Sequence, residues 1–336
     1  MARFVAGVFA LLGIAGVSLY RAEVPVEDLV DDFAGGASSF ETIEGTSVHY
    51  RDEGTGPTLL LLHGTASSLH TWDGWVHHLK DRFRILRLDL QGFGLTGPNG
   101  DHDYSAERQV RVIAELLRRR GVERCSVAGN SLGGRIAWGF ALDHPQRVDR
   151  LILVDSAGPR ALHVPPEPHV QDDGAKVGRR AGGGRTLDLG RVPILKDLLT
   201  RLTPRFLVER SLRQVYGDPT RVRPELVDRY HRMLLREGNR DALVRALNTR
   251  WGQTVEPEQL RDLHQPTLIQ WGEDDRWIPL SVGQRLEALI PDARLVVYPG
   301  AGHVPMEEIP EETARDAAAF LLTSPGNGAR ADVTGL

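Results

Sequence analysis

A serine between two glycines, placed where an apolar strand gives way to an apolar helix, constrains this chain more than any other feature. Residues 125–128 are mostly apolar, as in a buried strand, and residues 136–142 are an apolar run long enough for a buried helix. Between them, Gly129, Ser131 and Gly133 follow the pattern Gly-x-Ser-x-Gly. A strand-to-helix corner forces its central residue into a sparsely populated backbone conformation, for which small neighbours leave room. It would point the Ser131 hydroxyl outward and put the next backbone N–H at a helix N-terminus, as an acyl-transfer nucleophile needs. An ordinary Gly/Ser turn is the alternative, and the rest of the chain must decide.

Composition excludes several other kinds of protein. With 336 residues, 41% hydrophobic and 26% charged, the chain has the make-up of a soluble globular protein. A formal net charge of -4 gives no reason to expect a nucleic-acid partner. The single cysteine, Cys125, excludes an internal disulfide and any multi-cysteine metal site, and its place in an apolar strand predicts burial. We expect no cofactor and no metal.

The N-terminus predicts a membrane segment. Residues 4–20 carry no charge, and this run of seventeen residues is at the short limit for crossing a bilayer. No clear small-x-small cleavage site precedes Tyr20. We therefore expect residues 1–21 to be an uncleaved anchor, with a cleaved signal peptide (and secretion) or a buried helix as alternatives. Arg3 precedes the segment and acidic residues follow it, so the positive-inside tendency places the body outside the cytoplasm. Residues 22–39, acidic and then rich in glycine, are expected to be a linker.

Strands and helices alternate over residues 40–156 and again over residues 265–323. The predicted strands are unbroken apolar runs, which is typical of a mainly parallel sheet covered by helices on both faces. We predict strands near residues 58–62, 83–90, 125–128, 151–154, 266–271 and 294–298, and helices near residues 69–81, 105–120, 136–142, 282–290 and 312–322. The two stretches are predicted to form one α/β core.

Residues 157–264 interrupt this alternation without a clear buried strand. The stretch is far longer than a usual connection between a strand and a helix, so we expect an inserted helical subdomain. Such an insertion would cover the active edge of the sheet as a cap, or lid, and shape a substrate pocket. The tail, residues 324–336, is polar and rich in glycine and is expected to be disordered.

Chemically distinctive side chains follow the ends of the predicted strands. In a parallel sheet these ends share one edge, where ligands bind. A serine nucleophile needs a base within hydrogen-bond reach and a carboxylate to orient that base. His303 follows the last strand and Asp275 the one before it, and the order Ser, Asp, His is that expected for a nucleophile elbow. His63 and Asp89, which also end strands, are expected to stabilise loops through hydrogen bonds.

From His49 to Leu322 the chain resembles an α/β-hydrolase fold protein with a cap after the sixth strand of an eight-stranded sheet. The matching pieces are His63-Gly64-x-x-x-Ser68, Asp89-x-x-Gly92-x-Gly94, Gly129-Asn130-Ser131-Leu132-Gly133-Gly134, Trp271-Gly272-x-x-Asp275 and Gly302-His303. The resemblance implies Ser131 as nucleophile, His303 as acid and base, and Asp275 as orienting acid. It also implies an oxyanion hole made of the backbone N–H groups of Thr65 and Leu132.

Two other acids compete with Asp275 for the orienting role. The family spacing Gly-x-x-Asp selects Asp275 over its neighbour Asp274, which is expected to be exposed. Asp155 also ends a strand, at a place where some relatives put their acid, and stays an alternative.

The residues beside the nucleophile and the base bear on the substrate. Ser131 at the elbow excludes the aspartate-nucleophile dehalogenases and epoxide hydrolases. Asn130 resembles ring-fission C–C hydrolases, but many of these have Trp after the histidine, where this chain has Val304 and looks more like general esterases and lipases. We therefore expect hydrolysis of a small carboxylic ester, with an acyl lipid as a candidate. The alternatives are a C–C hydrolase and a catalytically inactive binding module of the same fold.

Overall fold

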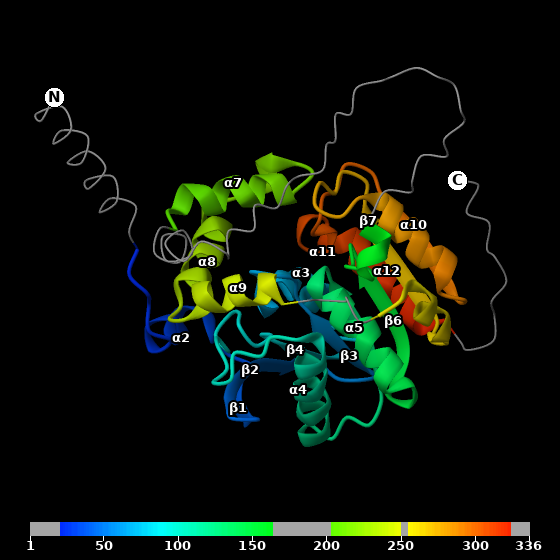
Figure 1. Ribbon diagram of the computed structural model, residues 1–336, viewed down its shortest axis with the longest axis horizontal. Coiled ribbons are helices and arrows are strands. Elements are labelled where there is room, and N and C mark those ends of the chain that lie inside the picture. Colours follow the sequence, from blue (N-terminus) through cyan, green and yellow to red (C-terminus); the bar gives the residue numbers. More distant parts are fainter. Residues whose placement is uncertain (1–20, 164–202, 250–254, 324–336) are drawn as a thin grey trace, which may run out of the picture.

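The computed structural model describes residues 21–163, 203–249 and 255–323, and these residues are built around one sheet (Figure 1). Its eight strands lie in the order β1-β2-β4-β3-β5-β6-β7-β8. β2 is antiparallel to β1 and β4, and every other pair of neighbours is parallel. The strands are β1 (Ser38–Ile43), β2 (Thr46–Glu53), β3 (Thr58–Leu62), β4 (Arg84–Leu88), β5 (Cys125–Asn130), β6 (Val148–Val154), β7 (Thr267–Gly272) and β8 (Ala293–Tyr298). The predicted mainly parallel eight-stranded sheet is confirmed.

Helices cover both faces of the sheet because its central strands are apolar on both faces. In β3, Leu60 and Leu62 join one buried cluster, and Leu59 and Leu61 join the other; all four are 0% exposed. α4 (Ala106–Arg119), α5 (Leu132–Asp143) and α10 (Leu280–Leu289) pack on the first face. α3 (Asp73–Leu79), α11 (Pro305–Glu308) and α12 (Pro310–Leu322) pack on the second.

Local signals set the ends of α4 as the sequence predicts. The hydroxyl of Ser105 accepts a hydrogen bond from the Arg108 N–H and caps the first turn. Gly121 follows the helix with a φ of +65°, a conformation that glycine adopts without strain. Cys125 is buried as predicted, and burial raises the pKa of its thiol to about 12, which keeps it inert.

The described part of the chain between β6 and β7 is helical, in agreement with a cap inserted after the sixth strand. It contains α7 (Arg205–Val215), α8 (Pro224–Leu235) and α9 (Asn239–Asn248), which lie together above the sheet (Figure 1). α7 and α8 join the second buried cluster through Val208, Leu212 and Val227. The cap is therefore built onto the core.

The segment expected to be a linker is packed against the body. It contains the helix α2 (Glu27–Phe33), and Leu29 is fully buried against Leu95 and Met233. Val24 also exchanges two backbone hydrogen bonds of 2.8 Å with Leu235, the last residue of α8, and with Glu237 just after it. The segment packs instead of forming a linker because it contains four apolar residues at near-helical spacing, which lie between acidic residues in the sequence: Val24, Val26, Leu29 and Phe33.

Both predicted terminal segments fall almost wholly outside the described residues. The expected membrane anchor, residues 1–21, is described only at Arg21, and the expected disordered tail, residues 324–336, is not described at all. Within the described ranges, no helix combines the length and the apolar character needed to span a bilayer.

Candidate active site

Ser131 lies at the corner between β5 and α5 in a strained backbone conformation. Its φ of 54° and ψ of -115° are rare for a residue with a side chain. A Cβ added to Gly129 would lie 2.2 Å from the Gly133 carbonyl oxygen, and a Cβ added to Gly133 would lie 2.2 Å from the Leu62 carbonyl oxygen. Only glycine fits at both positions, so the chain can turn this sharply. The predicted strand-to-helix corner is present, and the ordinary turn is excluded.

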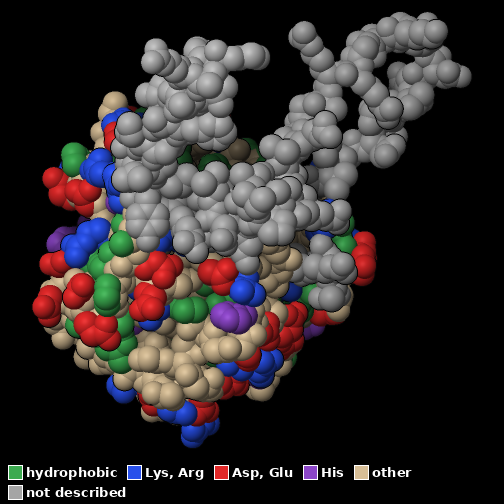
Figure 2. Space-filling view, turned by 60° about the vertical axis from the view of Figure 1, so that its left-hand side comes forward, with side chains coloured by type: hydrophobic (Ala, Val, Ile, Leu, Met, Phe, Trp, Pro, Cys, Tyr) green, Lys and Arg blue, Asp and Glu red, His purple; other side chains and the backbone are tan. Residues whose placement is uncertain are grey.

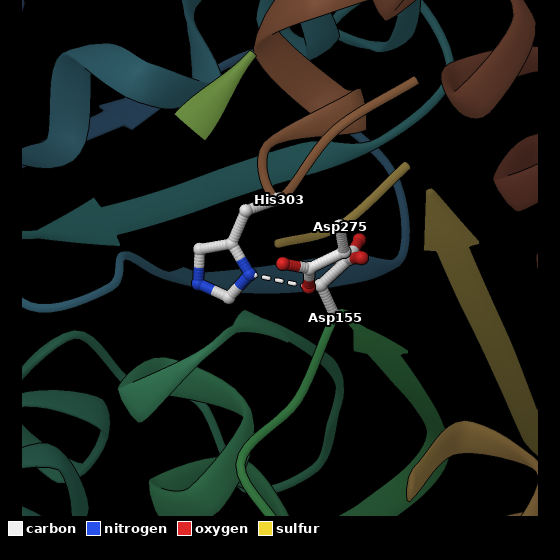
Figure 3. A group of neighbouring side chains, drawn as sticks. All are labelled: Asp155, Asp275 and His303. Atoms are coloured by element: carbon white, nitrogen blue, oxygen red, sulfur yellow. Dashed lines mark hydrogen bonds and ion pairs between the residues drawn. The ribbon is translucent and has the colours of Figure 1, made fainter. Parts of the chain in front are cut away.

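His303 and Asp275 form a buried pair at the same edge of the sheet. His303 Nδ1 lies 2.7 Å from Asp275 Oδ2 (Figure 3). The other carboxylate oxygen of Asp275 accepts the backbone N–H groups of Trp277 (2.7 Å) and Ile278 (3.0 Å). These two bonds fix the carboxylate, which in turn orients the imidazole and leaves Nε2 for proton exchange.

The side chain of Asn130 joins the serine corner to the loop between β8 and α11 that carries His303, which we call the histidine loop. Its amide Nδ2 donates to the carbonyl oxygens of Val154 (3.1 Å) and His303 (3.0 Å). The described residues contain no hydrogen bond between the Ser131 hydroxyl and the His303 ring. Without substrate this contact is commonly long, and it tightens in the complex.

The cap also holds the histidine loop, through a residue that sequence reasoning missed. The Glu308 carboxylate accepts the backbone N–H of Gly302 (2.8 Å) as well as those of Gly217 (3.0 Å) and Asp218 (2.7 Å) in the cap. The His303 N–H donates to the carbonyl oxygen of Val215, also at 2.8 Å. The linked residues are about 90 positions apart in the chain, and no local motif announces them.

The two N–H groups expected to form an oxyanion hole lie on segments that flank Ser131. Leu132 is the first residue of α5, and Thr65 follows Gly64 in the loop after β3. A Cβ added to Gly64 would lie 3.2 Å from Ser131 Cβ, which shows how closely this loop approaches the corner. Neither N–H donates to another described residue. The placement suits a carbonyl oxygen of a substrate bound at Ser131.

The three candidates for the orienting acid, Asp275, Asp155 and Asp274, differ in what surrounds them. The His303 ring pairs with Asp275, while Asp155 lies behind that pair and accepts the Gly272 N–H at 3.0 Å (Figure 3). Asp274 is exposed, as expected. Donor atoms of Asp155, Asp275 and His303 lie within 4.8 Å of one another, close enough to ligate an ion. The pair between His303 and Asp275 already uses two of these donors, and we assign no metal to them.

The histidine and the aspartate expected to stabilise loops do so. His63 Nδ1 donates to the Gly64 carbonyl oxygen (2.7 Å), and its Nε2 accepts the Leu90 N–H (3.0 Å). Burial lowers the pKa of His63, which keeps the ring neutral. Asp89 accepts the N–H groups of Leu69 and Leu95, both at 2.7 Å. Both roles are confirmed as structural.

Comparison with known proteins agrees with this geometry. A family model described as alpha/beta hydrolase fold matches residues 57–310. The hydrolase YugF of Bacillus subtilis (strain 168) is 28% identical over 284 residues, which cover 83% of this chain and 96% of YugF. A 2-hydroxy-6-oxononadienedioate/2-hydroxy-6-oxononatrienedioate hydrolase of Burkholderia vietnamiensis (strain G4 / LMG 22486) is 30% identical over 287 residues, which cover 82% of this chain and 90% of the relative.

A solved structure of a bacterial membrane phospholipase A is also similar. It aligns with a TM-score of 0.70 and 27% identity, over 96% of this chain and 98% of its own. The family model spans well over half of the chain, and the sheet order, the strained serine corner and the histidine–aspartate pair agree with it. The chain therefore belongs to the alpha/beta hydrolase fold family.

Proposed function

We propose that this hydrolase works through an acyl-serine intermediate, with Ser131 as nucleophile, His303 as acid and base, and Asp275 as orienting acid. The observation that supports this most is the bond of 2.7 Å between His303 and Asp275 at the edge where Ser131 occupies its strained corner. Nucleophile, base and orienting carboxylate are the three parts that acyl transfer needs.

In the proposed mechanism each proton has a defined path. Ser131 Oγ attacks a carbonyl carbon while its proton passes to His303 Nε2, and Asp275 stabilises the imidazolium that forms. The carbonyl oxygen becomes an oxyanion, which the N–H groups of Thr65 and Leu132 stabilise; losing one such donor typically costs about 100- to 1,000-fold in turnover. The imidazolium then protonates the leaving group. Water, activated by His303, cleaves the acyl-serine and restores the free hydroxyl.

For the substrate we propose a ring-fission product, in which the bond cleaved is a C–C bond next to a ketone. The support is the relative from Burkholderia vietnamiensis, whose name specifies such a hydrolase and which matches over 90% of its length. Similarity to these C–C hydrolases favours the alternative that the sequence placed second, behind ester hydrolysis. The leaving group is then carbon, and it takes the proton that His303 received from Ser131.

The sequence argument against C–C cleavage, valine in place of tryptophan after the histidine, is weaker in the folded chain. Val304 is only 7% exposed and belongs to the buried cluster that contains Met306. Its side chain therefore serves packing of α11 against the core, so its identity is a poor guide to the bond that is cleaved.

Hydrolysis of an acyl ester, including a lipid ester, is the second candidate. The alignment with the membrane phospholipase A covers 96% of this chain, whereas the match to the C–C hydrolase covers 82%. The greater coverage of the phospholipase alignment, together with the apolar run at residues 4–20, supports ester hydrolysis as the second candidate.

A substrate panel separates the two candidates. The full chain, purified in detergent, would be assayed with 2-hydroxy-6-oxo-6-phenylhexa-2,4-dienoate, with p-nitrophenyl esters from butyrate to palmitate, and with phosphatidylcholine; Ser131→Ala is the control. We expect kcat/KM for the dienoate to exceed that for p-nitrophenyl butyrate by about 100-fold, equivalent to ~2.7 kcal/mol. Faster cleavage of a long-chain ester or the phospholipid would overturn the C–C proposal in favour of the second candidate.

A further inference from the structure

Asp155 is a fully buried carboxyl group for which the proposed mechanism has no use. It stands directly after β6 with a φ of 42°, a left-handed conformation that aspartate tolerates better than most residues. Its Oδ1 accepts the Gly272 N–H at 3.0 Å, and its Oδ2 has no hydrogen-bond partner among the described residues. A buried polar atom without a partner in a native fold requires an explanation.

The carboxyl of Asp155 faces the carboxyl of Asp275 (Figure 3). Donor atoms of both groups and of His303 lie within 4.8 Å of one another. Two carboxyl groups this close in a buried site do not both ionise. Asp275 is the ionised one, because it accepts two backbone N–H groups and the His303 ring. The proton of the pair then resides on Asp155.

The other charges around Asp155 act in the same direction. Glu308, on α11, adds negative charge beyond that of Asp275. Burial, followed by the charge of Asp275, raises the pKa of Asp155 well above its usual range. The titratable groups that face Asp155 are thus Asp275, His303 and Glu308, from the loops after β7 and β8 and from α11.

We propose that Asp155 is a positioning residue, which keeps its proton and donates a hydrogen bond from Oδ2 to the carboxylate of Asp275. This inference rests on the triad of the proposed function and extends it by a fourth member. Of the two Asp275 oxygens, Oδ1 accepts two N–H groups, whereas Oδ2 accepts only His303 among the described residues and has a lone pair to spare. The bond from Asp155 would keep Asp275 ionised and limit its basicity, so that His303 remains neutral and active at lower pH.

Two substitutions that keep the branching at Cγ test the proposal. Asp155→Asn keeps an acceptor for the Gly272 N–H and an N–H donor for Asp275, but has no proton to lose. Asp155→Leu keeps the branched shape, although leucine is larger, and removes the donor. The hydrogen bond from Asp155 to the Asp275 carboxylate is strengthened by the charge of its acceptor, so we expect the leucine variant to lose about 10-fold in kcat with little change in KM. We also expect the acid limb of its pH profile, the pH range in which kcat/KM falls as the solution becomes more acidic, to move up by about one pH unit. We expect the asparagine variant to stay within about twofold of the wild type, with its acid limb unmoved.

A purely structural role predicts a different pattern. Loss of packing would lower the thermal midpoint and the amount of active enzyme without moving the acid limb, so an unmoved limb in Asp155→Leu overturns the proposal. Equal damage from the asparagine and leucine variants also overturns it, because then the ionised carboxylate matters and not the donor.

A measurement without turnover separates this inference from the proposed function. The proton NMR signal of the His303 Nδ1–H, at low field, reports the bond to Asp275 in the full chain. We expect it to shift in Asp155→Leu and to stay in place in Asp155→Asn. Absence of any turnover or serine labelling in the wild type would remove the proposed function, while the NMR comparison would still decide whether Asp155 acts on Asp275.

Discussion

Replacing Asn130 by alanine would cut a side-chain link between the serine corner and the histidine loop. The Asn130 amide donates to the carbonyl oxygens of Val154 and His303 at 3.1 Å and 3.0 Å, and its side chain is buried. After the substitution the Val154 carbonyl keeps the Ser131 N–H at 3.1 Å. The His303 carbonyl would have no other donor among the described residues. The damage therefore falls mainly on the loop that carries His303, the proposed base.

The expected magnitude follows from these partners. One net hydrogen bond contributes about 0.5–1.5 kcal/mol, and a buried carbonyl left without a donor adds about 1–3 kcal/mol. We expect Asn130→Ala to lower the free energy of unfolding by roughly 1.5–4.5 kcal/mol, a large part of a typical total of about 5–15 kcal/mol. Because the freed loop no longer holds the His303 ring in register with Ser131, we also expect kcat to fall about 10-fold or more while KM changes little.

A matched control exists in the cap. Asn239 is also buried, and its amide also donates to two carbonyl oxygens, those of Gly94 (3.0 Å) and Met233 (2.7 Å). Urea unfolding and steady-state kinetics would be measured for both alanine variants. We expect similar losses of stability, but a loss of kcat only in Asn130→Ala. If Asn239→Ala lowers kcat equally, or if Asn130→Ala leaves kcat intact, the reasoning about the histidine loop is refuted.

Three further predictions concern other parts of the chain. Gly64→Ala would put a methyl group 2.8 Å from Asn130 Oδ1 and displace the loop that carries the Thr65 N–H of the proposed oxyanion hole. Labelling of Ser131 by a fluorophosphonate should then slow about 100-fold without loss of folding, and unchanged labelling would contradict the proposed role of this loop. Burial lowers the pKa of His70 to about 4, so the unfolded chain takes up its proton first as pH falls. Stability should drop between about pH 6.5 and 4 by up to roughly 3 kcal/mol, and His70→Gln should flatten that drop in pH-dependent urea melts; an equal drop in the variant would contradict it. Removal of residues 1–20 should release the protein from the membrane fraction after cell fractionation; full-length protein found only in the soluble fraction would end the anchor proposal.

The sheet and the serine corner could be predicted because their causes are local. Leu59 to Leu62 are apolar without a break, as a strand buried on both faces requires. Gly129 and Gly133 are needed by the backbone contacts around Ser131, and that need is visible as a pattern of glycines. The pairing of His303 with Asp275 followed from their order after the last two strands, together with the family resemblance.

Contacts between distant segments were beyond the sequence. Nothing near Glu308 shows that its carboxylate holds cap and histidine loop together, because its partners come from Gly217 and Asp218. The docking of α2 was hidden for a similar reason, since the acids of that segment outweigh its few apolar side chains in composition. Asp155 was recognised as an acid at a strand end, but its position behind Asp275 depends on how two loops meet.

Covalent labelling of the wild type by a fluorophosphonate, read by mass spectrometry of its peptides, tests the central claim most directly. We expect one phosphonyl adduct on the peptide that contains Ser131, no adduct in Ser131→Ala, and labelling slowed by about 1,000-fold or more when His303 is replaced by glutamine. An adduct on a different residue, undiminished labelling of Ser131→Ala, or no labelling of the folded wild type would contradict the account; the last result would instead support a binding module of this fold.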